Sequence, residues 1–340
     1  MHAQFMQRAI ELSAQARYHA PPNPWVGCVL VRDNQVVGEG FTQPPGSDHA
    51  EIQALKKAGE LARGATAYVT LEPCSHFGRT PPCTHALIRA GVSKVFASIE
   101  DPDTKVKGKG LAELRCAGID VEAGLLSDQV TKSLTPYLHH RSTGLPYCVV
   151  KAAITADGRM AAQDGSSQWI TCEAARADAH RLRAQSQAIV IGSGTAIKDS
   201  PSLTVRHFDA IGIKQPLRVV LDTKSRLERK GSLFDETAPT WIVTQNDCGG
   251  ENGIDLLSLL QQLGQKGVVQ VLVEGGPKLL TSFWRENLIN QLSLYIGPRL
   301  LGNTGKPLFD LCFPNIASAP QMRLIDTQML GSSVRLDYQV

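Results

Sequence analysis

His49-Ala50-Glu51, followed by Pro73-Cys74 and then by Cys83, is the most informative pattern in this chain. One imidazole and two thiolates are ligands that suit a tetrahedral zinc ion with its fourth position left open. The histidine opens a helix-like segment, and Pro73-Cys74 follows the strand-like segment 67–71. Because the ends of packed elements hold a metal rigidly, this spacing predicts an α/β domain around a zinc site.

Glu51 lies two residues after the histidine, and the pattern does not require it as a ligand. A carboxylate beside metal-activated water can take up a proton and hand it on. The order H-x-E…P-C…C is typical of zinc-dependent nucleobase deaminases, in which activated water attacks an amino-bearing ring carbon. We therefore expect catalytic zinc, with Glu51 as the general acid–base. A structural zinc with His76 or His85 as fourth ligand is the alternative, and it would leave Glu51 without a task.

Length and composition describe an ordinary globular protein of two domains. The chain has 340 residues, of which 42% are hydrophobic and 20% charged, and its formal charge is +3 without a basic block. These values do not favour nucleic-acid binding. No apolar run is long enough to span a bilayer, the N-terminus lacks the apolar core of a signal peptide, and eight cysteines are too few for a disulfide scaffold. A cytoplasmic protein that binds neither nucleic acid nor membrane is expected.

Hydrophobic periodicity predicts alternating helices and strands in both halves of the chain, which indicates the α/β class. A polar, turn-rich link at 141–146 separates a first domain, residues 1–144, from a second, residues 145–340. The first domain is expected to have three layers. In order, the predicted elements are an N-terminal helix through residues 5–16, a hairpin at 27–38, a helix at 51–58, a strand at 67–71, a helix at 86–90, a strand at 94–99, a helix at 111–117, a strand near Ile119, then strands at 149–154, 188–191, 217–222, 240–243 and 269–273 with helices at 173–184 and 277–287.

Two glycine-containing turns follow apolar strands in the second domain, Gly192-Ser193-Gly194-Thr195 and Gly275-Gly276-Pro277. No G-x-G-x-x-G follows a strand, so the dinucleotide fold with that signature is disfavoured. Backbone amides at a helix start can nevertheless bind phosphate, and proline suits the first helical turn. Together the turns favour a cofactor pyrophosphate. Arg183 and Arg206 are candidates to clamp a substrate phosphate, since guanidinium forks match its oxygens.

Longer strings around these residues resemble one family, the bifunctional riboflavin-biosynthesis deaminase/reductases. In the first half they are Pro22 to Gly27, His49-Ala50-Glu51, the run from Glu72 to Cys83, Asp101-Pro102, Gly108 and Gly110. In the second half they are Lys151, Asp157-Gly158-Arg159, Ser167 to Thr171, Leu182 to Ala184, Asp199 to Arg206 and Glu274 to Pro277. The resemblance is weakest over 206–216 and 225–266. Eight residues separate Cys74 from Cys83, unlike the more familiar P-C-x-x-C, and we expect the insert to shape the pocket for a larger, phosphate-bearing pyrimidine.

The resemblance implies a cytidine-deaminase-like three-layer α/β/α domain and a dihydrofolate-reductase-like α/β domain that uses NADPH. It implies zinc-dependent hydrolytic deamination of 2,5-diamino-6-(5-phosphoribosylamino)pyrimidin-4(3H)-one. NADPH-dependent reduction of the ribosyl side chain then gives 5-amino-6-(5-phosphoribitylamino)uracil. By family position, the deaminase residues that would hold the ring and phosphate are Asn23, His76, Arg79 and Asp101.

Family position also implies contacts in the second domain. NADPH would contact Ala153, Trp169, Thr195, Asp199, Thr223, Gly276, Pro277, Lys278, Leu279, Leu280, Thr281 and Ser282. The phosphorylated substrate would contact Ser167, Arg183, Leu203, Arg206 and Glu274. Lys151, Asp199 and Glu274 are the catalytic candidates for handling a proton, and the sequence does not rank them.

Two other functions compete with this interpretation. One is a nucleoside or tRNA deaminase whose second domain is an accessory, which the cysteine spacing and the lack of a basic block disfavour. The other is a non-catalytic zinc-binding module that mediates assembly. A homo-oligomer, dimer or tetramer, is the expected quaternary state.

Overall fold

A computed structural model describes residues 1–77, 81–103, 106–206, 208, 213–250 and 253–340. The chain forms two compact units, one built mainly from residues 1–145 and the other from 146–209 and 214–340. Within the described parts of both units, no helix is long and apolar enough to cross a membrane.

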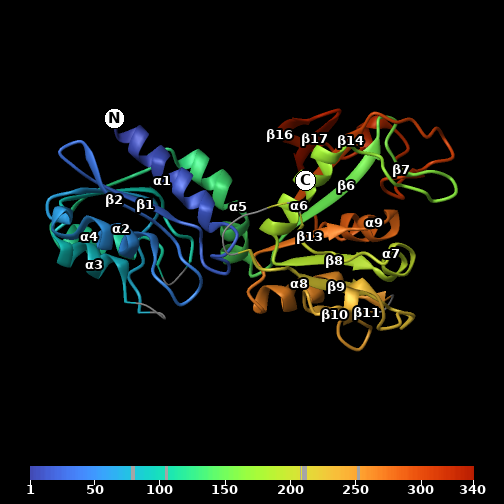
Figure 1. Ribbon diagram of the computed structural model, residues 1–340, viewed down its shortest axis with the longest axis horizontal. Coiled ribbons are helices and arrows are strands. Elements are labelled where there is room, and N and C mark those ends of the chain that lie inside the picture. Colours follow the sequence, from blue (N-terminus) through green and yellow to red (C-terminus); the bar gives the residue numbers. More distant parts are fainter. Residues whose placement is uncertain (78–80, 104–105, 207, 209–212, 251–252) are drawn as a thin grey trace. The chain divides into compact units, whose positions relative to one another are not determined.

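The first unit is a three-layer α/β/α structure around a five-stranded sheet (Figure 1). The strand order is β2-β1-β3-β4-β5; β1 pairs antiparallel with β2 and β3, while β3, β4 and β5 run parallel. Helices α1 and α5 cover one face of the sheet, and α2, α3 and α4 the other. The elements are α1 (His2–Ala16), β1 (Gly27–Arg32), β2 (Gln35–Phe41), α2 (Ala50–Ala58), the 3-10 helix η1 (Gly59–Ala62), β3 (Thr66–Leu71), α3 (Cys83–Ala90), β4 (Lys94–Ile99), α4 (Lys109–Cys116), β5 (Asp120–Ala123) and α5 (Ser127–Thr143).

Two glycines let helices from opposite layers approach this sheet closely. A Cβ atom on Gly27 in β1 would lie 1.9 Å from the carbonyl oxygen of Ala9 in α1. A Cβ on Gly40 in β2 would lie 2.3 Å from the carbonyl oxygen of Ala50, the first residue of α2. Glycine is required at both places because any larger residue would push the helix away from the sheet.

The second unit is built on an eight-stranded mixed sheet of order β10-β9-β8-β13-β6-β14-β17-β16 (Figure 1). Neighbours from β10 to β14 run parallel, and the last two pairs are antiparallel. Its elements are β6 (Tyr147–Thr155), β7 (Arg159–Ala161), α6 (Glu173–Gln185), β8 (Ala188–Gly192), α7 (Ser193–Asp199), β9 (Leu217–Leu221), η2 (Ser232–Phe234), β10 (Thr240–Val243), β11 (Gly249–Gly250), β12 (Gly253–Ile254), α8 (Leu256–Gln265), β13 (Gln270–Glu274), α9 (Pro277–Arg285), β14 (Gln291–Gly297), β15 (Lys306–Pro307), η3 (Ile316–Ser318), β16 (Arg323–Leu330) and β17 (Ser333–Gln339).

The central parallel strands are buried on both faces, as strands covered on both sides must be. Ile189 in β8, Leu272 in β13 and Val150 in β6 are fully buried. Their carboxyl ends lie at one edge of the sheet because neighbouring strands run parallel. This edge is where ligands bind in open parallel sheets.

The mixed α/β class and the predicted alternation are confirmed, and several elements were not predicted. The turn expected at 192–195 is the entry to α7, which starts at Ser193. Helix α8, strand β14 and the hairpin of β16 and β17 had no counterpart in the prediction.

Candidate functional site

The predicted metal ligands come together at the ends of three elements in the first unit. His49 caps the N-terminus of α2 in an extended conformation. Cys74 follows β3, and Cys83 is the first residue of α3. The Cys83 amide donates a hydrogen bond to the Cys74 sulfur at 3.4 Å, so a helix start faces a thiolate.

The geometry of these side chains fits a zinc ion. His49 Nδ1 lies 3.6 Å from Cys74 Sγ and 3.3 Å from Cys83 Sγ, and the three donor atoms lie within 4.8 Å of one another. Ligands of a tetrahedral zinc at its usual bond lengths are about 3.5 Å apart. Hydrogen bonding by Cys83 lowers the pKa of Cys74 to about 4, which favours the Cys74 thiolate, while the same hydrogen bond and burial raise the pKa of Cys83.

A fourth protein ligand is not found among the described residues. The metal-binding group contains His49, Cys74 and Cys83 alone. His85 Nε2 lies 2.8 Å from Glu113 Oε1, and His76 is exposed. Three ligands are the arrangement of catalytic rather than structural zinc sites.

Glu51 lies in the first turn of α2 and is 4% exposed. Burial, reinforced by the nearby Cys74 thiolate, raises the pKa of Glu51 to about 7. A carboxyl group with a pKa near the working pH can both accept and donate a proton, which is the property of a general acid–base.

A second buried carboxylate, Glu72, ties the segment before Cys74 to residues 101–111. It follows β3, two residues before Cys74, and is 4% exposed. Its oxygens accept hydrogen bonds from the amides of Gly108 at 2.9 Å and Gly110 at 2.8 Å, and from those of Asp101 and Leu111 at 3.2 Å. Because Gly110 and Leu111 belong to the first turn of α4, the charge also lies at a helix N-terminus. The sequence pattern that includes Glu72 predicts no role for it.

We expect Glu72→Gln to lower the free energy of unfolding of the first unit by about 2 kcal/mol, because hydrogen bonds to a charged group are worth about 1.5–3 kcal/mol and an amide NH₂ would face two N–H donors. Urea unfolding of the full chain measures this. Glu122→Gln is the matched control, since that side chain is 55% exposed and pairs with Lys94. Equal stability of Glu72→Gln and the control would contradict the expectation.

The structure does not test whether the other residues predicted for the first site hold the substrate. Asp101 is buried, and its carboxylate accepts hydrogen bonds from the Tyr137 hydroxyl at 3.1 Å and the Asp103 amide at 2.9 Å. Asn23 is half-buried in the segment between α1 and β1. Arg79 lies outside the described residues. Contacts of these residues with substrate stay predictions.

A cavity of about 2030 Å³ lies in the second unit at the carboxyl ends of its parallel strands. Most of the residues predicted there line it, namely Lys151, Ala153, Ser167, Trp169, Arg183, Thr195, Asp199, Leu203, Arg206, Thr223, Glu274, Gly276, Pro277, Lys278, Leu279 and Ser282. Leu280 and Thr281 are not among its lining residues. Leu280 is fully buried, and the Thr281 hydroxyl accepts a hydrogen bond from the Asp310 amide.

The cavity wall fits a dinucleotide cofactor. The turns after the neighbouring strands β8 and β13 both line it, and so does Thr223 after β9. A Cβ on Gly194 or Gly276 would meet no atom within 4 Å apart from its chain neighbours and its own helix, so the backbone is open there. Gly276 caps α9, whose first-turn amides can bind phosphate.

A charged cluster occupies one wall of the cavity. Lys151 of β6 and Glu274 of β13 are paired neighbours in the sheet. Arg183 holds Glu274 through two hydrogen bonds of 2.8 Å, from Nε and Nη2. Burial lowers the pKa of Lys151, with Glu274 opposing and Arg183 adding to this effect. Although burial alone would raise it, the Arg183 guanidinium lowers the pKa of Glu274 to about 2.

The ion pair predicts a pH dependence of stability. A carboxyl whose pKa falls on folding stabilises the fold above its unfolded pKa, here 4.5, and this contribution is lost as pH falls towards 2. We expect Glu274→Gln to be roughly 3 kcal/mol less stable than the unchanged chain at pH 6, with the difference smaller by roughly 2 kcal/mol at pH 3. Urea unfolding at the two pH values checks this, and a pH-independent difference would contradict it.

Two residues that line the cavity, Arg176 and Tyr295, were not predicted from the sequence. The Arg176 guanidinium lies 4.5 Å from the centre of the exposed Trp169 ring, and Lys151 Nζ lies 5.6 Å from that of Tyr295. Arg176 follows Trp169 by seven residues, but only the structure shows that the two meet.

Two family models match the chain, one for each unit. The model "Cytidine and deoxycytidylate deaminase zinc-binding region" matches residues 1–99, and "RibD C-terminal domain" matches residues 146–336.

Individual proteins resemble the whole chain. It is 43% identical to the riboflavin biosynthesis protein RibD of Chlamydia pneumoniae, over 99% of this chain and 95% of the relative. It is 40% identical to RibD of Escherichia coli K12, over 98% and 97% of the two chains. The solved structure of Acinetobacter baumannii RibD, form 2, is 38% identical with a TM-score of 0.90, covering 99% of this chain and 98% of the other. A Thermotoga maritima diaminohydroxyphosphoribosylaminopyrimidine deaminase/5-amino-6-(5-phosphoribosylamino)uracil reductase is 31% identical with a TM-score of 0.90 and the same coverage.

Proposed function

Because this chain belongs to the RibD family of riboflavin biosynthesis proteins, we propose that it catalyses two consecutive reactions on one phosphorylated pyrimidine. The first unit is a zinc-dependent deaminase, and the second is a reductase that uses NADPH. The observation that carries the first assignment is the convergence of His49, Cys74 and Cys83 beside the buried Glu51.

In the first reaction water adds to the ring carbon that bears the amino group, and ammonia leaves. His49, Cys74 and Cys83 would hold the zinc ion, which when bound supplies the positive charge that makes water a nucleophile near neutral pH. Glu51 accepts a proton from the attacking water and donates one to the ring nitrogen. It then assists protonation of the leaving amine, and its raised pKa suits both directions of transfer.

In the second reaction the ribosyl ring opens to a ribityl chain, as hydride reaches C1′ and a proton reaches the ring oxygen. NADPH supplies the hydride, and the protein orients the reactants and handles the proton. Glu274 stays a carboxylate locked to Arg183, so it orients that cluster instead of donating a proton. Lys151 is the proton-handling residue, because it lines the cavity beside Glu274 and burial lowers its pKa. Asp199, at the exposed C-terminus of α7, would contact the cofactor.

We expect Lys151→Met to lower the rate constant kcat for NADPH oxidation by about 10²-fold, the usual contribution of a general acid. Ammonia release by the same protein should not change. Steady-state rates for both reactions measure the effect. Full NADPH oxidation by the variant would assign the proton to another group.

A coupled assay tests the function as a whole. The zinc-loaded protein receives the diaminopyrimidinone that carries a phosphoribosylamino group, and ammonia release is followed before NADPH oxidation. Both signals are expected. Ammonia without NADPH oxidation would refute the reductase assignment, and neither signal would refute the substrate. Cytoplasmic location and a homo-oligomeric state stay predictions.

A further inference from the structure

Arg218, the second residue of β9, is a charged side chain with no exposed surface. The strand around it is otherwise apolar, with Val219 and Val220 fully buried. Its carboxylate partner is Asp235, at 2.8 Å from Nη2, and that carboxylate is 41% exposed. A buried charge costs several kcal/mol unless it is well hydrogen-bonded, so the bonds it makes are informative.

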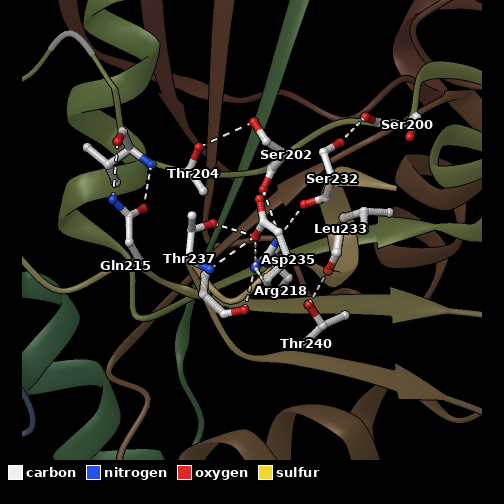
Figure 2. A network of polar contacts seen from close by, with 12 residues as sticks. Ser200, Ser202, Thr204, Gln215, Arg218, Ser232, Leu233, Asp235, Thr237 and Thr240 are labelled. Atoms are coloured by element: carbon white, nitrogen blue, oxygen red, sulfur yellow. Dashed lines mark hydrogen bonds and ion pairs between the residues drawn. The ribbon is translucent and has the colours of Figure 1, made fainter. Parts of the chain in front are cut away.

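The Arg218 guanidinium binds the backbone of two segments outside the sheet (Figure 2). One contains Ser202 and the other is residues 232–238. Nη1 donates to the carbonyl oxygens of Ser232 at 2.5 Å and Ser202 at 3.4 Å. Nη2 donates to the carbonyls of Asp235, at 3.0 Å, and Ala238. A rigid fork with several donors can satisfy this many carbonyls, which an ammonium cannot.

The two segments are also joined to each other beside Arg218. The Ser232 hydroxyl donates to the carbonyl oxygen of Ser200 at 2.6 Å (Figure 2). The turn from Ser200 to Leu203 is therefore held on both sides, at Ser200 by Ser232 and at Ser202 by Arg218.

This turn needs support because its backbone is strained. Ser200 and Leu203 have φ of +38° and +48°, in the left-handed region that costs a non-glycine residue about 1–2 kcal/mol. Asp199, Leu203 and Arg206 flank or belong to it, and all three line the reductase cavity. Arg183 Nη1 also donates to the Thr204 carbonyl at 3.3 Å, which ties the segment to the Arg183–Glu274 pair.

We propose that Arg218 is a positioning residue of the reductase site, which holds segment 199–206 so that Leu203 and Arg206 meet the phosphorylated substrate. The proposal rests on the proposed function. It predicts that disturbing Arg218 weakens binding of the pyrimidine more than it slows hydride transfer, because Lys151, the residue proposed to handle the proton, lies on β6 and not in this segment.

The test compares three variants of the full zinc-loaded chain. Arg218→Lys keeps the charge and loses the fork, and Ser232→Ala removes the hydroxyl bond to Ser200. Thr244→Val is the matched control, because its hydroxyl bonds the Asp247 carboxylate in the same unit, and neither residue bonds Arg218 or lines the cavity. The readouts are kcat and KM for the deaminated pyrimidine, KM for NADPH, and ammonia release.

The expected result is a rise in KM for the pyrimidine of about tenfold for Arg218→Lys and about threefold for Ser232→Ala, with kcat within about threefold. Thr244→Val should behave like the unchanged chain, and ammonia release should be unaffected throughout. An equal rise for Thr244→Val, or a change confined to kcat, would overturn the proposal. If Arg218→Lys fails to fold, Ser232→Ala decides, and an unchanged KM overturns it. No NADPH oxidation by the unchanged chain would refute the proposed function itself, and the positioning role with it.

Discussion

Glu51→Gln is expected to lower the rate of ammonia release by about 10²–10⁴-fold, the range typical for loss of a general acid–base. Glutamine has nearly the same shape but cannot take up or return a proton at neutral pH. Zinc content should not change, because the metal-binding group consists of His49, Cys74 and Cys83. Initial rates of ammonia release, with metal analysis of the same sample, measure both quantities.

The control for this variant is Glu60→Gln, which changes an exposed carboxylate in η1 shortly after α2. It should keep full deaminase activity. NADPH oxidation with the deaminated intermediate should be intact in both proteins, since the reductase residues belong to the other unit. Rapid ammonia release by Glu51→Gln would show that another group moves the proton.

Cys83→Ala should remove the zinc and with it the deaminase reaction. Two remaining ligands bind zinc far more weakly than three, so we expect less than about 0.1 zinc per chain after dialysis. Ammonia release should be lost and should not return when zinc is restored at micromolar concentration. NADPH oxidation with the deaminated intermediate is expected within about twofold of the unchanged protein.

Cys116→Ala provides the comparison, because Cys116 is an exposed cysteine on α4 of the same unit. It should keep both its zinc and its activity. Loss of zinc from both variants would point to general damage, and full activity of Cys83→Ala without zinc would refute the metal-dependent mechanism.

The metal site was predictable because its evidence is local in the sequence. Histidine, glutamate and cysteine are chemically distinctive, and each stands at the end of an element whose periodicity is clear. The structure adds what spacing does not contain, which is the burial of Glu51 and the four amides around Glu72. A glutamate before Pro-Cys has no local signal for a supporting role, since the amides it binds come from residues 101–111.

The role of Arg218, like that of Glu72, was not predictable, because the groups that it binds are distant in the sequence. An arginine in a strand is ordinarily solvated, and the carbonyls that enclose this one come from segments without periodicity. Helix α8 differs, because Leu256, Leu259, Leu260 and Leu263 stand at helical spacing and are all buried. That signal was available in the sequence. The hydrophobic pattern that predicts strands is weaker in the hairpin of β16 and β17. Strand β16 lies at the sheet edge and exposes most of its side chains.

The glycines beneath α1 and α2 have a consequence for how such sequences can diverge. Gly27 and Gly40 are not among the metal-binding residues, yet an added methyl at either would overlap a helix carbonyl. Because His49 and Glu51 are carried at the start of α2, a shift of that helix would move a metal ligand and the acid–base together. A larger residue at Gly40 is therefore expected to impair catalysis by moving α2, although Gly40 is not itself a catalytic residue. A survey of tolerated mutations would rank it with active-site residues although it supplies no catalytic side chain.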